Sequence, residues 1–368
     1  MMYRFKKIFL CFLLIVLSLI IVELFGHSFY YFKKGTFLWR VNNAGLVFNV
    51  RPFTEPVNDD RFVTNKKDFT YVMNEENYAW EVRIDSNRFR IGGNKYFTDK
   101  DNIVFLGDSV PFGWGIAGSK SIPSIFFDLL QKNHITEYGV INAAIPSYSL
   151  YQSIQRYEYE INEKFPVKYV ILQIYDPVSQ FLIWGRDWNR NICWTSNDTF
   201  IPAKAIFEYY SKKKTFFISL MYRYSSIYHL ACLIKIRLDK IKKLNPSLGL
   251  NDEYAFTLFE EENIDTLRSF YALLKKKNIK LIILSTNPTR PYSTNKFMHA
   301  GYIVHRLNKI LQNFASSYED VYFFDVNSYF NKIGRNGLFI DEACHLSHAG
   351  TQKEAEFIFE GLRSRDLL

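Results

Sequence analysis

Cysteine is scarce in this chain, with four residues in 368: Cys11, Cys193, Cys232 and Cys344. This number is too small for a disulfide scaffold, and no spacing among the four resembles a zinc site. If the chain faces an oxidising compartment, we expect at most one disulfide, and Cys193 with Cys344 is the pair we favour. The sequence therefore predicts neither a metal site nor a cofactor.

Charge of one sign is not concentrated anywhere either. The formal net charge is +9, but the basic clusters at 212–214 and 275–277 are short and no recognition motif accompanies them. A nucleic-acid surface needs both a basic stripe and such a motif, so we expect no nucleic-acid partner. The basic residues are interpreted as solvated helix faces or, functionally, as an attraction to anionic lipid or an acidic glycan near a membrane.

Long apolar runs are absent with one exception, residues 8–22, which Leu24 and Phe25 extend. About 18 helical residues of this kind reach about 27 Å, close to the hydrocarbon thickness of a bilayer. Three basic residues among the first seven precede the run, and such charge keeps its end of a span in the cytoplasm. The pattern predicts a membrane-spanning helix within residues 1–26.

Two other interpretations of this segment are weaker. A cleaved signal peptide needs small residues at its cleavage site, and Gly26-His27-Ser28 is a poor version of one. A buried helix of a soluble fold is disfavoured, because a run of this length that is apolar on every face is typical of a membrane span. We therefore expect a retained, single-pass anchor, with the rest of the chain on the periplasmic or extracellular side.

From residue 101 to residue 366, short apolar runs alternate with helical segments. Strands are expected at 103–106, 138–142, 169–174, 280–285 and 321–325, and helices at 121–132, 149–163, 258–277, 297–317 and 347–364. Strands that are apolar on both faces and separated by helices indicate a parallel sheet covered on both sides, so the fold class is three-layer α/β. Residues 178–250 are predicted to be an insertion, and residues 27–100 an irregular, β-containing region before the main domain.

The sharpest motif follows the first of these strands. Residues 103–106 run into Gly107-Asp108-Ser109, and Gly113 comes shortly afterwards. Gly107 permits a tight exit from the strand, which places Ser109 at the carboxyl edge of the sheet, where open α/β sheets bind ligands. A serine hydroxyl becomes a good nucleophile when a base accepts its proton. Ser109 is therefore the candidate nucleophile.

The candidate base lies near the C-terminus, where acidic residues precede His345 and a helical segment follows it. A catalytic imidazole needs a carboxylate that fixes its tautomer and stabilises its protonated form. Asp341 and Glu342 are both candidates for this carboxylate. The sequence thus supplies all three parts of a serine–histidine–acid triad.

These two segments resemble the first and last sequence blocks of the SGNH/GDSL hydrolase superfamily. The first block is Gly-Asp-Ser followed by Gly, and the last is Asp-x-x-His before a helix. The stretch from Ile84 to Arg90 also resembles that of membrane-anchored bacterial members. The resemblance covers about residues 84–364 apart from the insertion, and it implies a flavodoxin-like α/β/α domain with esterase, lipase, deacetylase or acyltransferase activity.

The chain departs from the family pattern in two inner blocks. The second block, Asn-x-x-x-x-Gly, reads here from Asn142 to Ser147, and the resemblance makes both residues candidates for oxyanion stabilisation or substrate binding. Ser147 keeps the backbone N–H that the family's Gly would donate to an oxyanion. The third block, Gly-x-Asn-Asp, reads Gln173-Ile174-Tyr175-Asp176, so the family's Asn donor is replaced by Tyr175. Losing one such donor costs about 10²–10³ in rate unless Tyr175, Gln173 or another group replaces it.

The last block also departs from the pattern, because it has one extra residue. Asp341 has the usual residue type but lies four positions before His345, whereas Glu342 has the usual spacing and a longer side chain. We favour Asp341 slightly as the triad acid.

The sequence leaves three functions open. The first is an esterase or O-deacetylase that acts on an acylated cell-envelope saccharide or lipid. The second is an acyltransferase that passes the same acyl group to a surface glycan. The third is a catalytically weak, membrane-tethered protein that binds or assembles glycans. Neither the substrate nor the oligomeric state follows from the sequence.

Overall fold

Two units make up the chain in the computed structural model, Met1–Val63 with Lys204–Leu248, and Thr64–Ala203 with Gly249–Leu368. The structure describes residues 9–10, 13–14, 17–18, 20–28, 52–57, 63–75, 78–146, 148, 150–173, 192–194, 200–202, 252–285, 308–341 and 344–368. In the first unit, the described residues between 9 and 28 are helical, and β1 spans Thr54–Pro56.

The second unit is built on a five-stranded sheet in the order β11-β10-β7-β5-β6. Its strands are β5 (Asn102–Gly107), β6 (Gly139–Asn142), β7 (Val167–Gln173), β10 (Lys280–Leu284) and β11 (Val321–Phe324). Every neighbouring pair is parallel. Numbered along the chain, this is the flavodoxin-like order 2-1-3-4-5, whose switch point lies at the carboxyl ends of β5 and β7.

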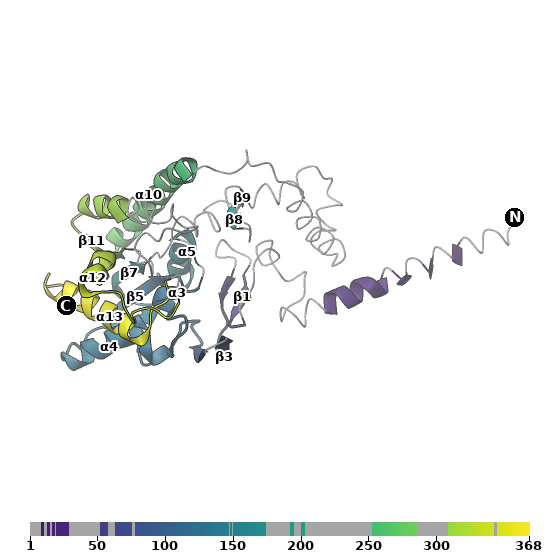
Figure 1. The fold of residues 1–368 in the computed structure, drawn as a ribbon, viewed down its shortest axis with the longest axis horizontal. Coiled ribbons are helices and arrows are strands. Elements are labelled where there is room, and N and C mark those ends of the chain that lie inside the picture. The colour runs from purple at the N-terminus through teal and green to yellow at the C-terminus, as the bar shows by residue number, and fades with distance from the viewer. Residues whose placement is uncertain are drawn as a thin grey trace. The chain divides into compact units, whose positions relative to one another are not determined.

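Helices cover both faces of the sheet (Figure 1). They are α3 (Ser109–Phe112), α4 (Ile122–Lys132), α5 (Leu150–Glu160), α10 (Asp252–Lys276), α12 (Val326–Ile333) and α13 (His348–Arg363), with the 3₁₀ helix η2 at Gly118–Lys120. Residues 308–316 are also helical. The predicted parallel, three-layer α/β fold is therefore confirmed for this unit.

The alternation of side chains along the strands divides the core into two layers. Val104 and Leu106 of β5 pack in a cluster with residues of α5 and α10, whereas Ile103 and Phe105 pack with residues of α4 and α13. Because both faces of the central strands are covered, these strands are apolar throughout, as the sequence pattern indicated. Buried polar side chains lie at the ends of the strands, such as Asn142 and Gln173, and on the covering helices, such as Arg156 and Glu354.

Smaller strands lie outside the main sheet. β3 (Phe69–Glu75) and β4 (Tyr78–Ile84) form an antiparallel pair within the region that the sequence predicted as irregular β structure. β2 spans Val63–Asn65. β8 (Ile192–Trp194) and β9 (Phe200–Pro202) pair antiparallel inside the predicted insertion, most of which lies outside the described residues.

Most predicted elements appear within a few residues of their expected ends, and the sequence analysis missed α12. Part of the predicted helix at 297–317 lies outside the described residues. So does part of the predicted membrane span, residues 8–25, and within the described part of the chain no helix is long and apolar enough to cross a membrane. Residues from Thr64 to Lys100 group with the main sheet, in the same unit.

Candidate active site

The turn that carries Ser109 begins where β5 ends. Gly107 has a φ of 140°, and a Cβ atom on it would lie 2.1 Å from the carbonyl oxygen of Gln173 on the neighbouring strand. A side chain at this position would therefore have both an unfavourable backbone conformation and a backbone clash. Only glycine allows the backbone to turn at this position. The turn places Ser109 at the switch point of the sheet.

Ser109 is the first residue of the short helix α3. The Asp108 carboxylate caps this helix by accepting the N–H of Val110 at 3.0 Å, and Asp108 is completely buried. The helix ends at Gly113, which has a left-handed φ of 89°. The Trp114 N–H donates to the Ser109 carbonyl at 2.9 Å. Both ends of the four-residue helix are thus fixed around the hydroxyl-bearing residue.

His345 lies in the loop between α12 and α13. The chain pairs with itself there, because Ile340 N–H donates to the His345 carbonyl and Ser347 N–H donates to the Leu338 carbonyl, each at 2.9 Å. Ser347 then caps α13 by accepting the N–H of Gly350. These hydrogen bonds hold the two ends of the loop together and fix the position of His345 just before the last helix.

The three predicted triad residues meet in one place. His345 Nε2 lies 2.9 Å from Ser109 Oγ, and His345 Nδ1 is hydrogen-bonded to the Asp341 carboxylate. The same carboxylate accepts the backbone N–H groups of Cys344 and His345 at 3.0 and 3.1 Å. Asp341 therefore fixes the imidazole with Nε2 directed at the serine. Of the two acids that the sequence left open, the structure places Asp341 on the imidazole; Glu342 lies outside the described residues.

A buried polar layer lies behind the triad. The side-chain amide of Asn142 donates to the carbonyls of Pro111 and Phe112 at 3.2 and 3.3 Å, and its oxygen accepts the N–H of Ala144. Asn142 is fully buried. Its place in the second family block made it a candidate oxyanion or binding residue, but its amide donates to the backbone of α3, so in this geometry it positions the nucleophile turn.

Arg90 belongs to the same layer and was not singled out from the sequence. Its guanidinium donates to the carbonyls of Phe112, Gly113 and Ile116, and its side chain is almost completely buried. Burial lowers the pKa of Arg90 to about 9. A Cβ atom on Gly113 would lie 2.8 Å from the guanidinium, so glycine is needed there as well. Arg90 ends the stretch from Ile84 to Arg90 that carries part of the family resemblance, but nothing in that stretch indicated this role.

The oxyanion residues expected from the sequence are only partly described. Ser147 and Tyr175 lie outside the described residues. Gln173 is 2% exposed, and its amide nitrogen donates to the Glu354 carboxyl group on α13. Its amide is therefore directed into the core rather than toward Ser109. The N–H of Ser109 lies in the first turn of α3, where backbone N–H groups have no partner within the helix.

Two tryptophans stand beside the triad. The Trp114 ring lies 6.0 Å from the His345 ring, centroid to centroid, and Trp80 packs edge-on against Trp114 at 5.1 Å. Both tryptophans are less than 10% exposed. An apolar wall of this kind excludes water from one side of the imidazole and strengthens its interaction with the carboxylate.

Cys344 is buried. The side chain of Cys193, its expected disulfide partner, lies outside the part of the structure that is described, so the Cys193–Cys344 disulfide stays a prediction. The side chain of Cys344 belongs to the apolar cluster between the sheet and α13, beside Leu346. The residue therefore fills core space next to His345.

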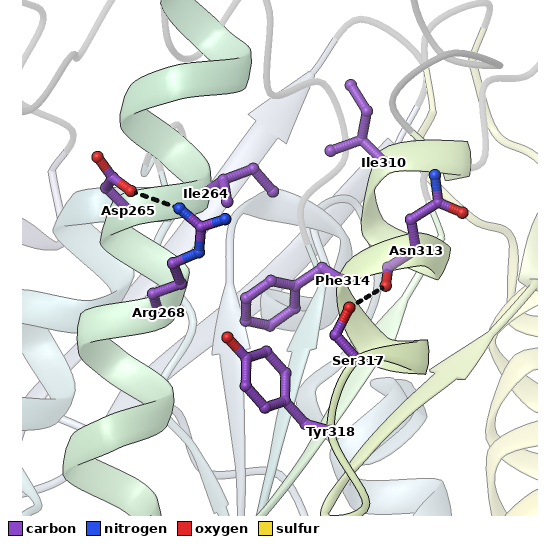
Figure 2. A pocket seen from close by; sticks show the side chains of 8 residues that line it. All are labelled: Ile264, Asp265, Arg268, Ile310, Asn313, Phe314, Ser317 and Tyr318. Atoms are coloured by element: carbon purple, nitrogen blue, oxygen red, sulfur yellow. Dashed lines mark hydrogen bonds and ion pairs between the residues drawn. The ribbon is translucent and has the colours of Figure 1, made fainter.

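A separate surface pocket lies between α10 and the helix at 308–316 (Figure 2). Ile264 and Arg268 line it from α10, and Phe314 and Tyr318 line it from the other side. Arg268 is paired with Asp265 on its own helix at 2.9 Å. No triad residue lines this pocket, so it is not part of the serine site.

A parallel α/β sheet with a serine, a histidine and an aspartate hydrogen-bonded in this order at its carboxyl edge is an arrangement that serine hydrolases use. No protein-family model matches the chain, and no curated protein does. Among solved structures it is similar to a protein described as lipolytic and of the G-D-S-L family from Desulfitobacterium hafniense DCB-2, with 12% identity, 71% of this chain and 99% of that chain covered, and a TM-score of 0.40.

Two further structures are similar. A lipase/acylhydrolase from Enterococcus faecalis has 12% identity over 72% of this chain and 96% of that chain, with a TM-score of 0.42. An acetylxylan esterase from Geobacillus stearothermophilus, solved as a catalytic mutant, has 13% identity over 73% and 95%, with a TM-score of 0.41. The Desulfitobacterium protein is described as a member of the G-D-S-L family, which the sequence motifs of this chain also resemble. All three scores are below 0.5, so the chemistry of this chain is argued from its own residues.

Proposed function

We propose that this chain is an ester hydrolase that uses Ser109 as nucleophile, His345 as general base and Asp341 as the orienting acid. The observation that carries the proposal is the unbroken chain of hydrogen bonds from Ser109 Oγ through both ring nitrogens of His345 to Asp341. Serine, imidazole and carboxylate in this order activate a hydroxyl that is otherwise a weak nucleophile.

In the first half-reaction, Ser109 Oγ attacks the carbonyl carbon of an ester while His345 Nε2 takes its proton. Asp341 stabilises the imidazolium through Nδ1, and the backbone N–H groups of Ser109 and Ser147 are the proposed donors to the oxyanion. The carbon–oxygen bond to the alcohol then breaks, and His345 returns the proton to the departing oxygen. The product is an acyl-enzyme on Ser109.

In the second half-reaction, His345 removes a proton from water, and the resulting hydroxide attacks the acyl carbon. Collapse of the second tetrahedral intermediate breaks the bond to Ser109 Oγ, which regains its proton from His345. The carboxylic acid leaves, and the triad returns to its starting state. No other reactant is required.

The substrate class that we propose is an acylated saccharide or lipid of the cell envelope. It rests on the sequence resemblance and on the apolar N-terminal segment, which we propose anchors the chain in a membrane with the catalytic unit outside the cytoplasm. The large apolar side chains described between Phe9 and Phe25 support this proposal, because they are 49% to 74% exposed in their own unit. Such a row of side chains is costly to hydrate and is stabilised by lipid.

The activity is tested with a fluorophosphonate probe and with p-nitrophenyl acetate. We expect the wild type to be labelled and to release p-nitrophenol, and Ser109→Ala to do neither while keeping the same circular dichroism spectrum. A folded wild type that no probe labels would overturn the enzymatic proposal and favour a glycan-binding role. Adding a saccharide with free hydroxyl groups then separates hydrolysis from acyl transfer, because transfer yields an acylated sugar in place of the free acid.

The location is tested by fractionation of cells that express the full chain. We expect the protein to stay with the membranes after an alkaline carbonate wash, and a protease added to intact spheroplasts to degrade the catalytic unit. Release by carbonate, or protection from the protease, would contradict the anchored, outward-facing arrangement.

A further inference from the structure

A second acid lies beneath the nucleophile turn, outside the triad. Glu354 is completely buried on α13, and its Oε1 accepts a hydrogen bond from the Gln173 side-chain amide. Among the described residues, neither Glu354 Oε2 nor Gln173 Oε1 has a hydrogen-bond partner. Two buried oxygens that can only accept are costly, so this pair needs a proton that an ionised carboxylate does not supply.

Protonation of Glu354 removes this cost. A neutral carboxyl group carries an O–H donor on Oε2, and Gln173 Oε1 is an acceptor without a partner in the same pair. The surroundings favour the neutral form, because burial above all, and the charge of Asp108 in addition, raise the pKa of Glu354 from 4.5 to about 8. The hydrogen bond from Gln173 acts in the opposite direction.

The pair connects the two halves of the triad. Gln173 is the last residue of β7 and pairs in register with Gly107, two residues before Ser109. Glu354 lies in the second turn of α13, the helix that begins three residues after His345. A hydrogen bond between these side chains therefore ties the segment that carries the imidazole to the strand end beside the hydroxyl.

We propose that Glu354, in its protonated form, is a positioning residue. By bonding to Gln173, it keeps the imidazole of His345 at hydrogen-bonding distance from the hydroxyl of Ser109. This inference rests on the serine-hydrolase function proposed above. Proton transfer between nitrogen and oxygen depends on separation and angle, and a displacement of about 1 Å costs on the order of 100-fold in rate. A neutral Glu354 can accept a hydrogen bond from Gln173 and also donate one, whereas a charged Glu354 can only accept.

Ionisation would act on the site in two ways. It would remove the only O–H that the pair can offer, and it would place a second buried carboxylate near Asp108, the cap of α3. The elements packed against α13 also carry Lys120, Asp128, Lys132 and Lys332, but Asp108 is the charged group that acts on Glu354. Activity is therefore expected to fall as the pH rises through about 8.

The test is the pH profile of kcat/KM for p-nitrophenyl acetate, measured from about pH 6 to about pH 10 in the full-length chain. We expect the wild type to lose activity on the alkaline side. Glu354→Gln should keep the wild-type rate at neutral pH and lose the alkaline decline, because its amide donates and accepts but cannot ionise. Glu354→Leu should be about 10–100-fold slower throughout, because it does neither.

The matched control is Glu356→Gln on the same helix. Glu356 is half-buried on the helix surface, and it bonds to Gln352 and Lys353 rather than to the sheet. This variant should keep the wild-type pH profile. An alkaline decline that persists unchanged in Glu354→Gln would overturn the proposal, as would a full rate in Glu354→Leu.

A stability measurement separates this proposal from the catalytic one. Because the pKa of Glu354 is raised on folding, its contribution to stability is fully present below about pH 4.5 and is lost as the pH rises through about 8. The Tm of the wild type should therefore fall relative to that of Glu354→Gln across this window. If it does, but Ser109 reacts with no probe at any pH, the buried pair is correct and the hydrolase function is not. If the Tm values of the wild type and of Glu354→Gln change with pH to the same extent, the assignment of a protonated Glu354 bonded to Gln173 is wrong.

Discussion

The polar groups on the two sides of the nucleophile turn differ in exposure and in use. On the open side, the side chains of His345 and Asp341 are 17% and 30% exposed. On the buried side, Arg90, Asn142 and Gln173 are at most 2% exposed. The groups on the open side are hydrogen-bonded to one another and to Ser109 through their side chains. Arg90 and Asn142 instead donate to backbone carbonyls of α3 and of the segment that follows it.

This difference separates chemistry from positioning. A group that must exchange protons with a substrate needs access, and its removal affects the rate more than the fold. A buried donor on a backbone carbonyl cannot reach a substrate, and its removal leaves an acceptor without a partner in the core. We therefore expect variants of the open side to lose activity at unchanged stability, and variants of the buried side to lose both.

The largest effect is expected for the nucleophile and its base. Ser109→Ala and His345→Ala should each reduce kcat by about 10⁴ or more, and the double variant should lose little beyond either single one, because the two groups act as a unit. Single-turnover kinetics with p-nitrophenyl acetate measure this. A double variant whose loss is the product of the two single losses would show that the residues act separately.

A smaller loss is expected for the orienting acid. Asp341→Asn should cost about 10³–10⁴ in kcat, because an amide can hold the ring in the wrong tautomer and cannot stabilise the imidazolium. Glu342→Gln, at the other acid that the sequence left open, should cost less than about tenfold. The reverse order of the two variants would assign the triad acid to Glu342.

On the buried side, Arg90→Met should lower stability as well as activity. The change leaves the carbonyls of Phe112, Gly113 and Ile116 without this donor, at a cost of about 3 kcal/mol or more. For a unit of this size, that corresponds to a fall in Tm of about 6–12 °C. Differential scanning fluorimetry and probe labelling should decline together, and Arg90→Lys should recover only part of both, because an ammonium lacks the fork of donors. Lost labelling at an unchanged Tm would instead place Arg90 among the reacting groups.

The part of the fold that follows from sequence is the part with a strong local pattern. The five strands of the sheet are short runs that are apolar on both faces. Their alternation with helical segments predicted the three layers. Ser109 and His345 were also predictable, because Gly-Asp-Ser after a buried strand and an acid before histidine are local signals with a chemical reason. Helix α12 was not predicted, because it begins two residues after β11 ends and its eight residues, Val326–Ile333, are too few to show a clear helical period.

The buried polar layer could not be predicted in the same way. Arg90 is brought to Gly113 and Ile116 by the tertiary fold, and nothing near it in sequence states that it will be buried. Glu354 has the sequence neighbourhood of a solvated helix face, with Lys353 and Glu356 beside it. Its partner Gln173 was considered only as an oxyanion donor, because its position in a family block suggested the open side of the turn. A charged residue at a core position is found only when the packing of helix on sheet is known.

The smallest effect is expected at Cys344, which lies between the two sides. Its side chain is 3% exposed and packs in the apolar cluster, although its backbone N–H donates to Asp341. Cys344→Ala keeps the backbone donor and removes one buried sulfur, so we expect a loss of about 1 kcal/mol in the free energy of unfolding and a kcat within about threefold of the wild type. The thiol should react with iodoacetamide only after unfolding, because its burial in the apolar cluster keeps the reagent away from the sulfur. Rapid alkylation of the folded protein would show that the loop between Asp341 and α13 opens. Cys344 would then belong to the open side, together with His345.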